Sequence, residues 1–235
     1  MEDELVEKSC IEVLKSRGVD GLLISPVSED SNIGLLQSFM DANIPVVLFD
    51  RMNSSLNTFK FGVKNFEGAY QATLHLLEQG NKDILHITGS QLSLAQERFN
   101  GFNTAHVDFG VPFQEKNYVA CELKVLEEVD LSIKDAIIKA RLAGQMPDAI
   151  FGATDLITVR TLGVLAEMNI KVPEEIAVIG FANTKAAFAL NPALSSITQP
   201  AKEIGYLAMK QLVTMILSKN KLEEFKIIEL DTHIC

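Results

Sequence analysis

The side chains that most often carry catalysis are present in this chain of 235 residues, but their spacing matches no common catalytic motif. The four histidines lie far apart in the sequence, and none belongs to an H-E-x-x-H motif or lies beside a C-x-x-C motif. They are His75, His86, His106 and His233. The sequence has no G-x-S-x-G motif, and Cys121 has no activating base near it in the sequence. The glycine motifs that bind dinucleotides and nucleoside triphosphates are also missing. We therefore expect no enzyme activity, no catalytic metal and no cofactor.

Charge and cysteine content narrow the class of protein further. Lys and Arg number 21 against 31 Asp and Glu, a net charge of −10, and no basic run is long enough to follow a phosphate backbone. The first ten residues, MEDELVEKSC, resemble no export signal, and no later window has the roughly 18 apolar residues of a membrane span. Three widely spaced cysteines favour free thiols. We expect a cytoplasmic chain that does not itself bind nucleic acid.

Polar residues that could bind a small molecule come directly after apolar runs. Asp50 ends the run PVVLFD, and Thr154 and Asp155 follow the run AIFGA. In sheets of parallel strands with helices on both faces, ligands bind at the carboxyl ends of the strands. These positions are therefore candidates for a binding site, provided that the apolar runs are strands of such a sheet.

The pattern of the whole chain supports such sheets. Short apolar runs alternate with longer amphipathic segments, which is typical of βαβ units and predicts the α/β class. We expect strands at 19–25, 45–50, 84–89, 118–123, 149–153 and 176–181, with 196–199 and 225–230 as further candidates.

Three helices carry recognisable boundary signals. Residues 4–17 are periodic and end before Gly18, Asn65 can cap a helix that Gly80 ends, and Pro200 suits the first turn of a helix over 201–217. Folds of this class normally begin with a strand. Because a helix comes first here, we expect that the first βαβ unit is lacking.

Six phrases at the strand ends, taken in register, resemble the lactose-repressor/galactose-repressor family of bacterial transcription regulators. The six phrases are VDGLLIS-P, IPVVLFD-R, ILHITGSQLSLAQERFNGF, MPDAIFGATDLI, VPEEIAVIGFAN and LNPALSSITQP. They cover nearly the whole chain, and the last two are the most specific to the family. The resemblance implies a two-lobed periplasmic-binding-protein-like (type I) fold with parallel sheets flanked by helices. It places residues 1–62 and 200–227 in an incomplete N-terminal lobe, and 63–199 and 228–235 in a C-terminal lobe. The family's helix-turn-helix domain is not in this sequence.

The resemblance also assigns candidate ligand contacts. Arg98, in QERFNGF, matches an arginine that reaches into the cleft between the lobes, and its planar fork of donors suits sugar hydroxyls or a carboxylate. The alternative is a helix-surface arginine paired with Glu97 or with solvent. Asp50 matches a carboxylate that accepts hydrogen bonds from the ligand, although it can equally cap the next turn or be neutralised by Arg51.

The other assigned positions have alternatives too. Thr154 stands at a ligand-facing position, whereas Asp155 can bind ligand or cap the helix that it begins. Phe151 corresponds to an aromatic residue that stacks on ligand in some relatives, but a strand Phe is a core residue by default. Ser25 and Gln199 are expected to contact ligand or carry the lobe crossing, or else to lie in surface loops.

Three positions depart from the family pattern. Ala182 replaces the acid that commonly follows G-F or G-Y, and Leu92 and Leu94 replace residues that are often polar. These changes predict a more apolar pocket. The apolar loop 186–194 corresponds to the family's dimer contact and predicts a homodimer, unless the loop folds onto its own lobe.

Taken together, the resemblance implies the effector-sensing and dimerisation domain of a bacterial transcription repressor. The implied partners are a small-molecule effector, most simply a sugar or sugar derivative, a second copy of the chain, and DNA only through the missing helix-turn-helix domain. A periplasmic sugar-binding protein of an uptake system is the main alternative. An α/β hydrolase or transferase is a third, but it lacks every signature noted above.

Overall fold

The chain divides into two compact units. The computed structural model describes residues 3–28, 30–52, 55–89, 93–123, 125–184, 190, 193–218 and 224–235. The first unit is Met1–Lys64 with Pro200–Asp231, and the second is Asn65–Gln199 with Thr232–Cys235. We expected the last crossing near Ile228; it falls between Asp231 and Thr232 instead, because the strand that contains Ile228 is hydrogen-bonded to a strand of the first unit.

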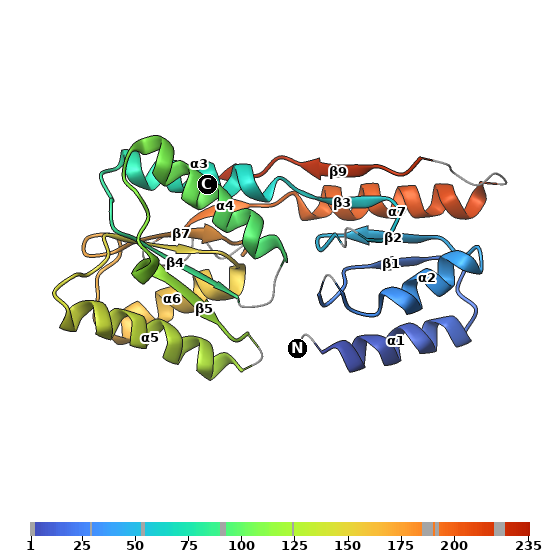
Figure 1. The fold of residues 1–235 in the computed structure, drawn as a ribbon, viewed down its shortest axis with the longest axis horizontal. Helices are drawn as coiled ribbons and strands as arrows, with labels where there is room; N and C mark the ends of the chain where they lie inside the picture. The colour runs from blue at the N-terminus through green and yellow to red at the C-terminus, as the bar shows by residue number, and fades with distance from the viewer. Residues whose placement is uncertain are drawn as a thin grey trace. The chain divides into compact units, whose positions relative to one another are not determined.

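The first unit contains a four-stranded parallel sheet (Figure 1). Its strands are β1 (Leu22–Ile24), β2 (Val46–Phe49), β3 (Lys60–Val63) and β9 (Ile227–Leu230), in the order β1-β2-β3-β9. The apolar pattern did not predict β3, whose sequence KFGV is interrupted by a lysine and a glycine. Lys60 is nevertheless buried, and burial lowers the pKa of its ammonium group.

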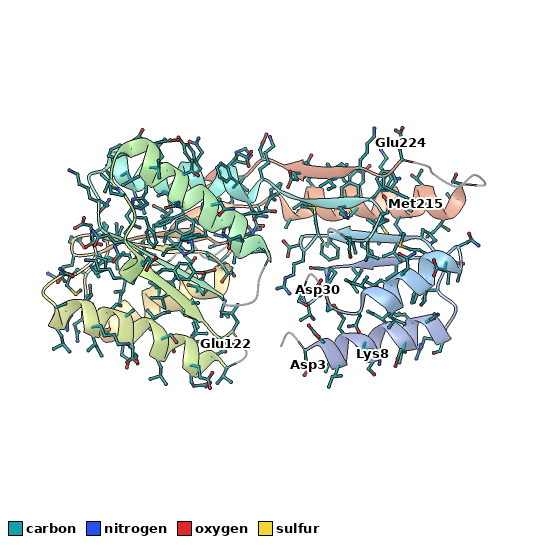
Figure 2. All side chains as sticks on the ribbon, in the orientation of Figure 1. Asp3, Lys8, Asp30, Glu122, Met215 and Glu224 are labelled. Carbon is teal, nitrogen blue, oxygen red and sulfur yellow. The ribbon has the colours of Figure 1, made fainter. Side chains whose placement is uncertain are left out.

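Helices cover both faces of this sheet. On one face, α1 (Glu4–Ser16) and α2 (Ile33–Asp41) contribute Ile11, Leu36 and Phe39 to a cluster with strand residues. On the other, Ile204, Ala208 and Leu212 of α7 (Ala201–Leu217) pack against β2 and β3. Asp3, labelled in Figure 2, caps α1 by accepting hydrogen bonds from the amides of Leu5 and Val6.

The second unit contains a six-stranded sheet in the order β10-β8-β7-β6-β4-β5. Its strands are β4 (Ile84–Gly89), β5 (Tyr118–Cys121), β6 (Ala149–Gly152), β7 (Ala177–Phe181), β8 (Ser195–Thr198) and β10 (His233–Ile234). Five of them are parallel, and β10 is antiparallel to β8. β5 therefore forms one edge of the sheet.

This sheet also lies between two pairs of helices. The face with Phe151 and Phe181 packs on α3 (Asn65–Glu78) and α4 (Ser93–Phe109), and the face with Ile150 packs on α5 (Leu126–Leu142) and α6 (Asp155–Glu167). A Cβ atom on Gly101 would lie 2.1 Å from the carbonyl oxygen of Phe66, so glycine is what allows α4 to approach α3 this closely. The central strands of both sheets are buried on both faces, which explains their apolar character and confirms the predicted α/β class with parallel sheets flanked by helices.

Two further observations concern the chain as a whole. Cys10, Cys121 and Cys235 are unpaired thiols. Within the described part of the chain, no helix combines the length and the apolar character needed to cross a membrane.

Candidate functional site

Polar groups connect the carboxyl ends of three neighbouring strands in the second unit. Asp155, after β6, accepts a hydrogen bond at its Oδ1 from the amide of Asn183, after β7, at 3.1 Å. Asn183 in turn donates to the carbonyl of Gln199, after β8, at 3.0 Å and accepts from the Gln199 amide at 2.7 Å. The structure thus brings Asp155 and Gln199 together through Asn183. The sequence analysis missed Asn183, although it directly follows the departure at Ala182.

Arg98 lies at the same edge of the sheet but is buried, with 3% of its surface exposed. Its Nε donates to Oδ1 of Asn65 at 2.8 Å, and a terminal nitrogen donates to the carbonyl of Ala153, after β6, at 2.5 Å. Its guanidinium carbon is 3.5 Å from the centre of the Phe181 ring. The alternative of a surface arginine paired with Glu97 is wrong, because the group is enclosed. Its contact with a ligand stays a prediction.

Helix α3 begins at Asn65 itself rather than after it. The side chain that we expected to cap the helix holds Arg98 instead.

At the start of α6, the expected roles of two neighbours are exchanged. Thr154, expected to face a ligand, is the cap: its hydroxyl oxygen accepts from the amide of Ile157 at 3.3 Å. Asp155, for which capping was an alternative, is the first helical residue, and its carboxylate binds the Asn183 amide. Asp155 therefore remains a candidate for polar binding, while the structure gives Thr154 a local role.

We expect Thr154→Val to lower the free energy of unfolding by about 1 kcal/mol, because valine keeps the shape of threonine but cannot accept the Ile157 amide. Urea denaturation of the variant measures this difference. Thr104→Val, at a half-buried position within α4, is the control and should change stability less. Equal effects of the two substitutions would contradict the capping role.

Phe151 is a core residue, as is usual for a phenylalanine within a strand, and stacking of its ring on a ligand stays a prediction. It is fully buried, and its ring stacks on that of His86 with centres 5.2 Å apart. Ala182 is also enclosed, with 1% of its surface exposed, so its methyl group packs in the core and does not make a pocket more apolar. Leu94 is buried as well.

Two expectations fall wholly or partly outside the described residues. Leu92 lies outside them, and of the loop 186–194 only residues 190, 193 and 194 are described. Leu194 is buried in the core of its own unit. The dimer contact of this loop stays a prediction.

In the first unit, Asp50 follows β2 in a strained turn. Its φ is 60°, and the amide of Arg51 donates to the carbonyl of Phe49 across it at 2.7 Å. The Arg51 guanidinium donates to the carbonyl of Val27 at 2.9 Å, and its neutralisation of Asp50 stays a prediction. Ser25 directly follows β1 and is half-buried. Carboxyl-end polar groups are thus present in both units.

The described residues offer no metal centre: no three His, Cys, Asp or Glu side chains among them are placed to hold an ion. What the two edges provide is a set of carboxylates, amides and backbone groups. Such groups exchange hydrogen bonds with polar ligands and need no covalent step.

Comparison with known proteins agrees with this fold and chemistry. The family model described as "Periplasmic binding protein-like domain" matches residues 73–233. The chain therefore belongs to the periplasmic binding protein-like domain family.

Its relatives within that class are transcription regulators. The chain is 29% identical to the HTH-type transcriptional repressor PurR of Aliivibrio fischeri strain MJ11, over 97% of this chain and 66% of that repressor. It is 26% identical to the arabinose metabolism transcriptional repressor of Halalkalibacterium halodurans, over 92% of this chain and 58% of that protein. The transcriptional regulator CelR in complex with cellobiose matches 97% of this chain and 68% of its own length, with 25% identity and a TM-score of 0.84. The resemblance to the lactose-repressor/galactose-repressor family is confirmed, and the chain spans less than two thirds of the length of these two repressors.

Proposed function

We propose that this chain is the effector-sensing and dimerisation domain of a bacterial transcription repressor that acts in the cytoplasm. The observation that carries the proposal is the similarity to named repressors over 97% of the chain. The strand-end network of Asp155, Asn183 and Gln199 supplies binding groups, and no metal cluster is found among the described residues. The protein binds ligand and does not transform it. Its DNA contacts belong to a helix-turn-helix domain outside these 235 residues.

The effector is a sugar or a sugar derivative. Names of relatives refer to arabinose and cellobiose, and carboxylates and amides at the strand ends are suited to accept from and donate to hydroxyl groups. Asp50 in the first unit and Asp155 in the second are the carboxylates that we assign to this task. An effector that binds one conformation of the domain more tightly than another shifts the equilibrium between those conformations, and a coupling of about 1–3 kcal/mol is enough for a switch.

Thermal melting of the purified chain tests the proposal. L-Arabinose, D-ribose, cellobiose, glucose 6-phosphate and hypoxanthine are compared at equal concentrations. A true effector at about one hundred times its dissociation constant adds about 2.7 kcal/mol and should raise the melting temperature by about 5–10 °C. Turnover of any compound would contradict the proposal, as would an export leader on the complete gene product. The second result would favour the periplasmic uptake protein.

Asp50→Gly is expected to raise the free energy of unfolding by about 1 kcal/mol, because glycine adopts a positive φ without steric cost. The same substitution should weaken effector binding at least tenfold, because the carboxylate is lost. Asn43→Gly is the matched control: Asn43 has φ 59° and is exposed at the end of α2, so the strain is relieved without loss of affinity. Unchanged affinity in Asp50→Gly would remove Asp50 from the site.

A further inference from the structure

The chain passes between its two units three times, and the second unit holds the residue on its own side of each crossing. These crossing residues are Asn65, Gln199 and Thr232. The contacts that hold them lie within the second unit and converge on residues 181–183, which are the last residue of β7 and the two that follow it. The end of one strand therefore lies beside all three crossings.

Phe181 serves the first and the third crossing. The guanidinium carbon of Arg98 lies 3.5 Å from the centre of its ring, and Arg98 donates to Oδ1 of the crossing residue Asn65. A Cβ atom on Gly68 of α3 would lie 2.6 Å from Oγ1 of Thr232 and 3.2 Å from Cζ of Phe181. Glycine therefore leaves the space in which the third crossing packs close to the same ring.

The second crossing is held by a pair of hydrogen bonds. The side chain of Asn183 accepts from the amide of Gln199 at 2.7 Å and donates to the carbonyl of the same residue at 3.0 Å. One side chain thus binds both backbone groups of the last residue before Pro200. Two bonds from one planar group fix the orientation of Gln199 as well as its position. We call this pair of bonds the Asn183 clasp.

The clasp is connected to a candidate effector group. The backbone amide of Asn183 donates to Oδ1 of Asp155 at 3.1 Å. The side chain of Asp155 is exposed, and within the described structure this bond leaves Oδ2 able to accept a hydrogen bond from a hydroxyl group. Asp155 acts on the backbone of Asn183, and Gln199 is held by its side chain. A restraint on Asp155 therefore reaches the second crossing through a single residue.

The crossings differ in how easily their contacts open. Asn65 and Arg98 are each only 3% exposed, so water does not compete for the bond between them. Asn183 and Asp155 are exposed, so water competes for their hydrogen bonds and this link opens at a lower free energy. Ligand binding shifts an equilibrium most readily where both states are populated. The second crossing is therefore the one that an effector can control.

We propose that Asn183 couples Asp155 to the crossing at Gln199. Asn183 is a positioning residue, which acts by holding the Gln199 backbone and not by touching the effector. A hydroxyl group bound to Oδ2 of Asp155 restrains the carboxylate, the Asn183 amide and then Gln199, so that the crossing opens less often. The effector's part in this proposal rests on the proposed function, whereas the coupling itself is a property of the chain without ligand.

Hydrogen exchange of the Gln199 amide, measured by NMR on the complete 235-residue chain without ligand, tests the coupling. Asn183→Ala should speed this exchange at least fivefold, because the amide loses its acceptor. Asp155→Ala leaves that acceptor in place but releases the Asn183 backbone, and should speed the exchange at least twofold. In the double variant, the substitution of Asp155 should add nothing, because the clasp that transmits its effect is already lost.

Two conservative variants separate this role from general stability. Asp155→Asn loses the charge at the start of α6, as Asp155→Ala does, but keeps an oxygen that can accept from the Asn183 amide. Its exchange at Gln199 should therefore stay close to that of the wild type. Asn183→Asp keeps the acceptor for the Gln199 amide but loses the donor to its carbonyl, so its exchange should lie between those of the wild type and Asn183→Ala.

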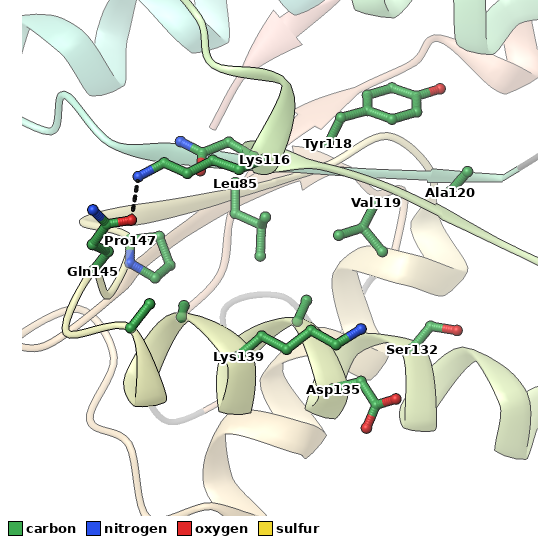
Figure 3. Close-up of a pocket in the computed structure, with 14 residues that line it drawn as sticks. Leu85, Lys116, Tyr118, Val119, Ala120, Ser132, Asp135, Lys139, Gln145 and Pro147 are labelled. Carbon is green, nitrogen blue, oxygen red and sulfur yellow. Dashed lines mark hydrogen bonds between the residues drawn. The ribbon is translucent and has the colours of Figure 1, made fainter.

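Gln145→Ala is the matched control. Like Asn183, Gln145 is an exposed residue of the second unit with an amide side chain. It accepts a hydrogen bond from Lys116 at 3.0 Å beside the groove between β5 and α5 (Figure 3), and no residue that lines this groove is a crossing residue. The loss of this bond should leave exchange at Gln199 within twofold of the wild type.

The sugars tested above distinguish this proposal from the proposed function. If L-arabinose, D-ribose and cellobiose all leave the melting temperature unchanged, the sugar effector is in error while the exchange results still decide the coupling. A sugar that does raise the melting temperature should slow exchange at Gln199 at least threefold in the wild type, and by less than that in Asn183→Ala.

Four results would overturn the proposal. Exchange at Gln199 is unchanged in Asn183→Ala, in which case there is no clasp. The effects of Asp155→Ala and Asn183→Ala multiply in the double variant, in which case the two residues act independently. Asp155→Asn exchanges as fast as Asp155→Ala, in which case the charge on α6 matters and the hydrogen bond does not. Gln145→Ala matches Asn183→Ala, in which case exchange reports only a general loss of stability.

Discussion

Arg98→Met is expected to lower the free energy of unfolding by about 2–4 kcal/mol. The substitution removes the donors to Asn65 and to the carbonyl of Ala153 and leaves those two oxygens in a buried setting, where each unpaired group costs about 1–3 kcal/mol. It also removes the cation from the face of the Phe181 ring. Urea denaturation at neutral pH, with the slope checked for two-state behaviour, measures the difference.

Two further variants make this prediction specific. Arg98→Lys keeps the positive charge but not the planar guanidinium group. We therefore expect its free energy of unfolding to lie between those of the wild type and Arg98→Met. Arg141→Met, at an exposed position near the end of α5, should change stability by less than about 0.5 kcal/mol. If Arg98→Met is as stable as Arg141→Met, the arginine does not hold the strand ends together, and a direct role toward the effector becomes the better explanation of its position.

The second large effect concerns pH. His86 is fully buried among Phe99, Phe102, Tyr118 and Phe151, and neither ring nitrogen has a hydrogen-bond partner in the described structure. Burial, with a smaller contribution from His106, lowers the pKa of His86 to about 3. The unfolded chain binds a proton here below about pH 6.5, whereas the native chain does not until about pH 3. Protonation therefore favours the unfolded state, and stability falls as the pH falls between these values.

From pH 8 to pH 5, this single group should lower the free energy of unfolding by about 2 kcal/mol. His86→Phe should remove most of that dependence and add about 1–2 kcal/mol at pH 7, because a ring without unpaired nitrogens replaces the imidazole. Denaturation curves from pH 5 to pH 8 give both quantities. His75→Gln, on the exposed face of α3, removes a histidine without touching the aromatic cluster and is the control. If His86→Phe keeps the slope of the wild type, other groups are responsible for it.

His106 lies beside this cluster and acts in the same direction. Its ring centre is 4.7 Å from that of Phe102, its Nδ1 lies 2.9 Å from the carbonyl oxygen of Val111, and burial lowers its pKa. The free energy of unfolding of the double variant with His86→Phe and His106→Phe should therefore depend on pH even less than that of His86→Phe alone.

Particular elements show how far the sequence can predict this fold. Strands with continuous apolar runs, such as β2 and β6, were predicted because burial on both faces requires such runs. The boundaries of α7 were predicted because Pro200 marks its start. β3 was missed because Lys60 and Gly62 interrupt its pattern, and only pairing with β2 and β9 makes KFGV a strand. The short β10 was missed because two residues carry no periodicity.

The candidate site, like the fold, could be predicted from the sequence only in part. Strand-end positions can be read from the sequence, since a polar residue after an apolar run must lie at the edge of a parallel sheet. The hydrogen-bond partners of these residues cannot be predicted from the sequence, because they lie far apart in it. Arg98 binds Asn65, 33 positions away, and Ala153, 55 positions away. Which of Thr154 and Asp155 caps α6 also depends on a long-range contact, the bond from the Asn183 amide that holds the carboxylate.

The sequence alone determined the class, most of the strands and the family, because local apolar periodicity and strand-end phrases are properties of contiguous residues. The tertiary structure decided which of the marked side chains are buried, which pair with one another, and that the end of β7 lies beside all three crossings. Those outcomes depend on contacts between segments far apart in the chain, and a hydrogen bond or a gap between two elements exists only once both are in place.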